Sequence, residues 1–225
     1  MILTGALVNG AAIVAGALVG MFGGKLMPDR LKKAVMSALA LIVIGIAVPG
    51  LMKSNHALIP ILSLVIGTVI GELLDIDGAV NRLGDFLQKK VGGQGSFTQG
   101  FVTGTLVFAV GAMAVMGALD SGIKGDHSVL IAKSVIDGIS AVVFASTMGL
   151  GVAFSGIPVF VLEGLIAVLA SVVAPYLGAA VIAEISFTGS LMILAISFNM
   201  LGITKIKVLN MTPGLLLPIL LCLFM

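Results

Sequence analysis

The sequence predicts an all-α integral membrane protein with seven or eight transmembrane helices, inverted repeats and some broken helices. Of its 225 residues, 59% are hydrophobic and 10% are charged, and the mean hydropathy is +1.25. An ordinary soluble domain has about 25% charged residues. The charges cluster and leave apolar runs that are long enough to cross a bilayer as helices, whereas barrel strands need only about 10 residues with polar alternation. Helical spans are therefore expected along the whole chain.

Charged segments separate the first three expected spans. The first span is the apolar stretch that ends before Lys25, and the second follows the basic segment 30 to 33. The third follows Lys53 and contains Glu72 near its end. The first run is longer than the apolar core of a signal peptide, so Met1 is expected to begin the mature protein.

The later spans are bounded in the same way, and the whole chain, residues 1 to 225, is expected to form a single polytopic domain. The fourth span ends just before Asp120, the seventh contains Glu184 near its start and ends before Lys205, and the eighth follows Lys207. In chain order, we expect spans at about residues 3 to 23, 33 to 51, 56 to 74, 98 to 118, 128 to 148, 155 to 174, 180 to 201 and 208 to 225.

The distribution of Lys and Arg predicts the orientation. Nine of them fall in the loops after spans one, three and seven. The opposite loops hold only Lys53 and Lys124, and Lys133 lies within span five. Because basic loops stay in the cytoplasm, the N-terminus is predicted to lie outside, and with eight spans the C-terminus does too.

Residues 75 to 92 follow span three and alternate between apolar and charged side chains. The apolar side chains recur at helical spacing, with basic and acidic residues between them. We expect a short amphipathic helix on the cytoplasmic surface, although an ordinary solvated linker would also fit. The apolar positions are Ala79, Val80, Leu83, Phe86 and Leu87.

A short motif recurs three times and suggests internal repeats. Thr4, Thr103 and Thr188 each begin a Thr-Gly-x-Leu sequence that opens an apolar run. Three spans separate the first two copies, so the repeat units would have opposite orientations in the membrane, which is typical of transporters. Chance similarity remains an alternative, because Gly, Thr and Leu are abundant. The candidate units are residues 1 to 75, 98 to 174 and a partial third unit, 185 to 225.

Charged residues within spans are functional candidates, because a charge at mid-bilayer costs about 3 kcal/mol or more. Lys133 and Asp137 are four residues apart and share one helix face, on which Ser134 adds a hydroxyl. Glu163 lies in a run without other charges from 138 to 183. The structural alternatives are a snorkelling Lys133 paired with Asp137, and a protonated Glu163 bonded to a neighbouring helix.

Glycine and small polar residues indicate breaks in some helices. Broken helices expose carbonyl and amide groups that bind ions or solutes, although Gly, Ser and Thr also serve as ordinary packing residues between membrane helices. Glu72 and Glu184 are expected at the interface, where they reach water, and Asn9 is expected to pack. The candidate contacts are Gly111, Asp120, Ser146, Thr147 and Asn199.

The motifs of enzymes and cofactor sites are missing from the sequence. His56 and His127 stand alone, and Cys222 is the only cysteine, so no metal site, disulfide or cofactor is expected. The embedded carboxylates have no nucleophile or metal companion, and we expect neither catalytic residues nor an enzyme. No basic stripe with stacking aromatics indicates nucleic acid.

One block of the sequence resembles a known family. The chain is similar to the YdfK/YqgA-type prokaryotic multi-pass membrane proteins, a family defined by a domain of unknown function, DUF554. The resemblance implies a multi-pass protein of the cytoplasmic membrane of a prokaryote and leaves its activity open. It covers essentially the whole chain and is most specific between residues 104 and 155, in Gly111 to Gly117, Lys133-Ser134, Asp137-Gly138, Phe144 to Val152 and Phe154-Ser155.

The function predicted from these residues is transport. We expect a small secondary transporter that moves a small solute or ion coupled to H⁺ or Na⁺, with Asp137 and Glu163 as coupling carboxylates and Lys133 as their charge partner. A passive channel and a structural or assembly protein that binds partner helices are the alternatives. The expected partners are the lipid bilayer, the solute with a proton or monovalent cation, and a second copy of the chain.

Overall fold

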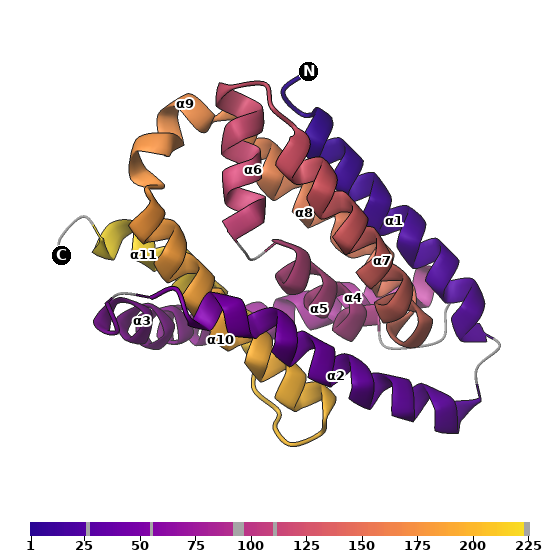
Figure 1. Ribbon diagram of the computed structural model, residues 1–225. Helices are drawn as coiled ribbons and strands as arrows, with labels where there is room; N and C mark the ends of the chain where they lie inside the picture. Colours follow the sequence, from indigo (N-terminus) through magenta and orange to yellow (C-terminus); the bar gives the residue numbers. More distant parts are fainter. Residues whose placement is uncertain (26–27, 55, 92–96, 110–111, 223–225) are drawn as a thin grey trace.

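The computed structural model describes residues 1–25, 28–54, 56–91, 97–109 and 112–222, and helices dominate this part of the chain (Figure 1). No strand occurs within these ranges, so the predicted all-α class is confirmed. The elements, in order, are α1 (Thr4–Lys25), α2 (Asp29–Leu51), α3 (Leu58–Leu74), α4 (Ile76–Val91), α5 (Phe97–Ala109), α6 (Ala112–Ile123), α7 (Ser128–Met148), α8 (Gly151–Val168), α9 (Ala170–Val173), η1 (Ala174–Tyr176), α10 (Ala179–Met200), η2 (Val208–Leu215) and α11 (Leu217–Leu221).

Five of the described helices are long and apolar enough to cross a membrane, and the number is seven if each of two bent pairs counts as one span. The pair α3 and α4 bends by 52°, and the pair α5 and α6 by 60°. The fourth expected span corresponds to α5 and α6 and is bent between them. The eighth expected span is shorter than predicted, because the apolar stretch Val208–Leu221 combines a 3-10 helix with one short α-helix. Pro213 and Pro218 lack the amide hydrogens that a continuous helix needs.

Helix α1 lies alongside α7 with its backbone in direct contact (Figure 1). The contact surface of α1 has a glycine every four residues, at Gly16, Gly20 and Gly24. A Cβ atom added at each would overlap a carbonyl oxygen of α7. Those oxygens belong, in the same order, to Gly138, Val142 and Ser146. Both sets of numbers rise together, so the helices are parallel, and small residues allow this close approach between membrane helices.

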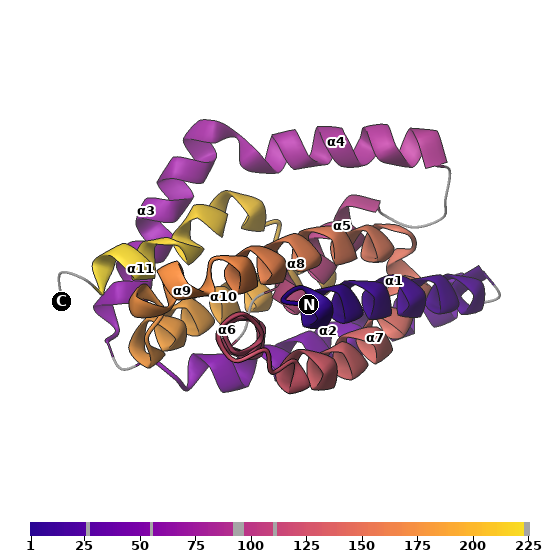
Figure 2. The same cartoon turned by 90° about the horizontal axis from the view of Figure 1, so that it is seen from above.

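Helix α8 packs against both α1 and α5 (Figure 2). A Cβ added at Gly10 of α1 would lie 3.1 Å from the carbonyl oxygen of Gly156, and one added at Gly164 would lie 3.2 Å from Leu3, so α8 is antiparallel to α1. A Cβ added at Gly100 of α5 would lie 3.1 Å from the amide nitrogen of Val152. Glycines thus draw α1, α5, α7 and α8 together around a common centre.

The remaining helices form a second group next to this centre. Helix α2 packs on α10, where the Ser197 hydroxyl donates to the Ala40 carbonyl at 2.7 Å, and η2 packs on α3. Helix α4 leaves the end of α3 at Asp75, whose φ of 48° is left-handed, and extends along one side of the bundle (Figure 2). The expected segment 75 to 92 is therefore helical over Ile76–Val91. Its position at the cytoplasmic surface remains a prediction.

Candidate functional site

A cluster of polar side chains lies buried where α1, α7 and α8 meet. Its members are Asn9 of α1, Lys133 and Asp137 of α7, and Glu163 of α8. Asn9 and Glu163 have no exposed surface, and Lys133 and Asp137 are 7% and 6% exposed. Asp137 lies nine residues after Ser128, at about 14 Å along the axis and near the middle of α7, whereas Asn9, Lys133 and Glu163 each lie five residues from one end of their helices. We call these four residues the charged cluster.

The ammonium group of Lys133 is the centre of this cluster. It pairs with the Asp137 carboxylate one turn further along α7. Its nitrogen lies 3.5 Å from Oε1 of Glu163 and donates to the carbonyl oxygen of Phe108 at 2.6 Å. The Asn9 amide, Nδ2, donates to the same Oε1 of Glu163 at 2.9 Å. Three acceptors on three helices therefore surround the three N–H groups of one lysine.

The Phe108 carbonyl is available because α5 ends inside the bundle. The last carbonyl groups of a helix have no partner within that helix, and they form the negative end of its dipole. Phe108 is the penultimate residue of α5, and the chain bends by 60° between α5 and α6. A buried ammonium satisfies such a carbonyl and is stabilised by the dipole. Lys133 therefore ties the broken helix to the carboxylates of α7 and α8.

The charged cluster contains one more negative group than positive groups when all three ionise. Asp137 and Glu163 are carboxylates, and Lys133 is the cation that they share. Two of the cluster's oxygens, Oδ1 of Asn9 and Oε2 of Glu163, are buried without a hydrogen-bond partner. An unpaired buried acceptor costs about 1–3 kcal/mol, and an unbalanced buried charge costs more. The arrangement favours the uptake of one further proton or cation.

The structure brings together three of the residues predicted from the sequence, Asp137, Lys133 and Glu163. Ser134 is buried next to Lys133, but its hydroxyl donates to the Ile131 carbonyl of its own helix at 2.7 Å. Gly111 lies outside the described residues. The cluster is therefore smaller than the predicted set, and its core is charged.

The other predicted contacts lie apart from the cluster. Asp120 forms an ion pair of 2.7 Å with Lys124 at the end of α6. The hydroxyl groups of Ser146 and Thr147 donate to carbonyl oxygens three residues earlier in α7. Asn199 holds the turn after α10, where its side chain bonds the backbone amide and carbonyl of Ile206. Each of these polar groups has a local partner in the fold.

Two members of the site were not expected from the sequence. Asn9 was interpreted as a packing residue, yet its side chain reaches Glu163 on a helix 154 positions away in the sequence. An amide inside an apolar run needs a polar partner, and this signal could have identified Asn9. Nothing in the sequence identifies the Phe108 carbonyl as part of the site, because every residue carries a carbonyl group. This one is available to Lys133 because it lies at the end of α5.

Glu184 differs from its expected environment. The sequence predicted a carboxylate that reaches water, but Glu184 is only 1% exposed. It accepts hydrogen bonds from the Ser54 hydroxyl at 2.7 Å and from the His56 amide at 3.2 Å. The loop between α2 and α3 folds back on α10 and covers this side chain. Glu184 therefore ties the loop between α2 and α3 to α10 at one end of the bundle.

Glu72 has the exposed position expected for it and anchors the start of η2. Its side chain is 55% exposed and accepts from Lys207 at 2.6 Å and from the Asn210 amide at 2.5 Å. Asn210 in turn accepts from the backbone amide of Asp77 at 2.7 Å. The hydrogen bond to Glu72 raises the pKa of the Lys207 ammonium above its ordinary value. These contacts hold the α3–α4 bend against η2.

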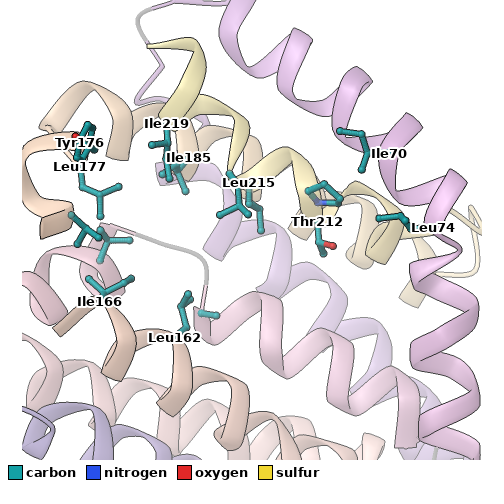
Figure 3. Close-up of a pocket in the computed structure, with 15 residues that line it drawn as sticks. Ile70, Leu74, Leu162, Ile166, Tyr176, Leu177, Ile185, Thr212, Leu215 and Ile219 are labelled. Carbon is teal, nitrogen blue, oxygen red and sulfur yellow. The ribbon is translucent and has the colours of Figure 1, made fainter. Parts of the chain in front are cut away.

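An apolar cavity of about 760 Å³ opens beside the broken helix (Figure 3). It reaches Ala109, the residue after Phe108, and it is also lined by Leu162 and Ile166, on either side of Glu163 in α8. The residues of the charged cluster do not line the cavity, but Ala109 and Leu162 in its wall are sequence neighbours of Phe108 and Glu163. The other lining residues are Ile70, Leu74, Val115, Val173, Tyr176, Leu177, Ile185, Thr212, Pro213, Leu215, Leu216 and Ile219.

Comparison with known proteins identifies the family. A family model described as "Protein of unknown function (DUF554)" matches residues 4–223. The chain belongs to the DUF554 family. This confirms the resemblance seen in the sequence and agrees with a membrane protein of several helices.

Two relatives cover nearly the whole DUF554 chain. It is 28% identical to the uncharacterized membrane protein YdfK of Bacillus subtilis over 218 residues, which are 95% of this chain and 93% of YdfK. It is 29% identical to the uncharacterized protein YqgA of Escherichia coli over 219 residues, with the same two coverages. No solved structure matches the chain.

Proposed function

We propose that this DUF554 protein is a small secondary transporter that moves a small solute or ion coupled to H⁺ or Na⁺. The observation that carries the proposal is the charged cluster at the break between α5 and α6. Transporters of this kind hold their ion and substrate sites near the bilayer midplane, at discontinuous helices. Buried ionisable groups in a membrane are expensive, and they mark ion pathways and proton relays.

The contacts of Lys133 suggest how ion binding is coupled to movement. One ammonium group is shared between the carboxylates of Asp137 and Glu163 and the Phe108 carbonyl. A proton or cation that neutralises one carboxylate leaves Lys133 free to hold the end of α5. When the ion leaves, both carboxylates compete for the same ammonium. The ion load therefore biases the bend between α5 and α6, which is the kind of two-state element that alternating access requires.

The apolar cavity is the candidate solute site in this proposal. It lies against Ala109 and Leu162, so a solute bound there contacts both the broken helix and the helix that carries Glu163. The hydroxyl of Thr212 in the lining donates to the Leu209 carbonyl at 2.7 Å and is already satisfied. The lining thus favours a solute with a largely apolar surface.

The proposal also covers the membrane in which the protein lies and whether it catalyses a reaction. We place the protein in the cytoplasmic membrane of a prokaryote with its N-terminus outside, and a reporter fused after Met225 tests the topology. We propose no catalytic activity. In the ranges that the structure describes, no group of three or more His, Cys, Asp or Glu residues is arranged to hold a metal ion.

The test is uptake by purified protein in lipid vesicles. The vesicles contain a pH-sensitive dye, and a proton or Na⁺ gradient is imposed while a panel of small apolar and amphipathic solutes is added. We expect Asp137→Asn and Glu163→Gln to abolish gradient-driven uptake. Asp120→Asn, which removes a carboxylate outside the cluster, should retain it. Equal uptake by all four proteins would refute the assignment of the coupling site, and solute flux that ignores both gradients would indicate a passive channel.

A further inference from the structure

The two unpaired oxygens of the charged cluster belong to one pair of side chains. Asn9 donates through Nδ2 to Oε1 of Glu163 at 2.9 Å, and the atoms left without a partner are the other polar atom of each group, Oδ1 and Oε2. Both are acceptors when Glu163 is a carboxylate. A single proton on Oε2 makes that oxygen a donor, and Oδ1 of Asn9 is a buried acceptor without a partner in the same pair of side chains. Where the two atoms meet, the amide and the carboxylic acid share two hydrogen bonds.

We propose that Glu163 holds one exchangeable proton on Oε2, clamped by the Asn9 amide, and that this proton is the coupling ion of the transporter. The proton site stands on the contacts of Asn9 and Glu163, whereas its role in coupling rests on the proposed function. The proton changes the charge of the cluster from one net negative to neutral. In a buried site this balance removes the cost of an unpaired carboxylate.

A bound metal cation fits the same atoms less well. Hard cations in proteins are surrounded by about six or more oxygen ligands. Only Oδ1 of Asn9 and Oε2 of Glu163 are unpaired in the described part of the cluster. The ammonium nitrogen of Lys133 lies 3.5 Å from the other oxygen of Glu163 and would repel a second cation. Both unpaired atoms are acceptors, so the pair lacks only a donor, and a proton supplies it.

The groups that face Glu163 come from each helix packed around it. Helix α1 contributes the neutral amide of Asn9, and α7 contributes Lys133 and Asp137. Helix α5 contains no charged residue and contributes the Phe108 carbonyl through Lys133. Helix α6 carries Asp120, which is paired with its own Lys124, and α9 contains no titratable residue. Lys133 and Asp137 are thus the charges that accompany the proton.

Release of the proton has a structural consequence. Glu163 becomes a second carboxylate next to Lys133, which already holds Asp137 and the end of α5. The clamp on the Asn9 side also loses one of its two hydrogen bonds. The proton therefore connects α1 to α8 when it is bound, and its loss draws Lys133 away from the bend between α5 and α6.

Infrared difference spectroscopy tests the proposal on full-length protein in lipid vesicles. A protonated carboxylic acid has a C=O stretch that is separate from the carboxylate bands. We expect wild-type protein to lose this band when the pH is raised, and Glu163→Gln to lack it at every pH. Asp137→Asn should retain the band, and Asn9→Leu should shift it because the amide hydrogen bond is gone. Glu163→Gln resembles the protonated acid in shape and charge, so it is expected to fold.

The outcomes separate this inference from the transport hypothesis. A band that persists in Glu163→Gln and disappears in Asp137→Asn places the proton on Asp137 and overturns the proposal. A band that responds to Na⁺ at constant pH, or no titrating band in the wild type, overturns it as well. If the band shows the expected pattern in the variants but the vesicles show no proton flux, the proton site is supported and its role in transport is refuted.

Discussion

Replacement of Lys133 by Met is the most informative perturbation of the charged cluster. Met matches the length of the lysine stem but removes the ammonium group that Asp137, Glu163 and the Phe108 carbonyl share. The Asp137 carboxylate is then buried without its cation. Breaking a buried ion pair in this way costs about 3–5 kcal/mol, and the orphaned carbonyl adds about 1–3 kcal/mol. The single variant is therefore expected to lose much of the protein's stability.

A second substitution separates the two contributions. In Lys133→Met with Asp137→Leu, no ionised partner remains for the missing ammonium if Glu163 holds its proton. Only the unpaired Phe108 carbonyl is left, and the loss should fall to about 1–3 kcal/mol. If Glu163 is ionised instead, one buried carboxylate remains without its cation, and the double variant keeps a loss of about 3–5 kcal/mol.

The assay is reversible unfolding in mixed detergent micelles, followed by the circular dichroism of the helices. Wild type, both single variants and the double variant form a double-mutant cycle, which isolates the interaction between Lys133 and Asp137. A loss below about 1 kcal/mol for Lys133→Met would show that the ammonium is not a buried partner of the carboxylates. That result would refute the reasoning from which the coupling site was built.

Three further predictions concern other parts of the molecule. Gly20→Ala should cost about 1–3 kcal/mol because its Cβ overlaps the backbone of α7, whereas Gly23→Ala, with nothing within 4 Å of the added atom, should cost nothing in the same unfolding assay. The backbone amide of Ser128 donates to Asp126 at 2.9 Å and holds the pKa of Asp126 below its usual range. The Asp126 carboxylate therefore stabilises the fold above about pH 3.9, and this contribution is lost as the pH falls further. Asp126→Asn should make the free energy of unfolding less dependent on acid pH. Equal acid titrations of the variant and the wild type would contradict this. Leu162→Trp should fill the apolar cavity and block solute uptake while the infrared band of the protonated acid remains; undiminished uptake would place the solute elsewhere.

The sequence predicted the helical spans well because hydrophobicity over about 20 residues is a local property of the chain. It placed the breaks less well. The eighth expected span is a 3-10 helix and a short α-helix, because Pro213 and Pro218 interrupt a run that is apolar enough to span. The run near residue 110 was expected to be interrupted, and the chain bends there by 60°.

The sequence by itself determined the membrane class and the pairing of Lys133 with Asp137. Helical geometry puts residues four apart on one face, so this ion pair needs no knowledge of the other helices. Only the tertiary structure decided that Glu163, Asn9 and the Phe108 carbonyl join the pair. These contacts depend on which helices approach closely and in which register, and that is set by glycines meeting backbone across α1, α5, α7 and α8. Spacing along a chain reports neighbours on one helix, whereas a site between helices exists only after they have packed.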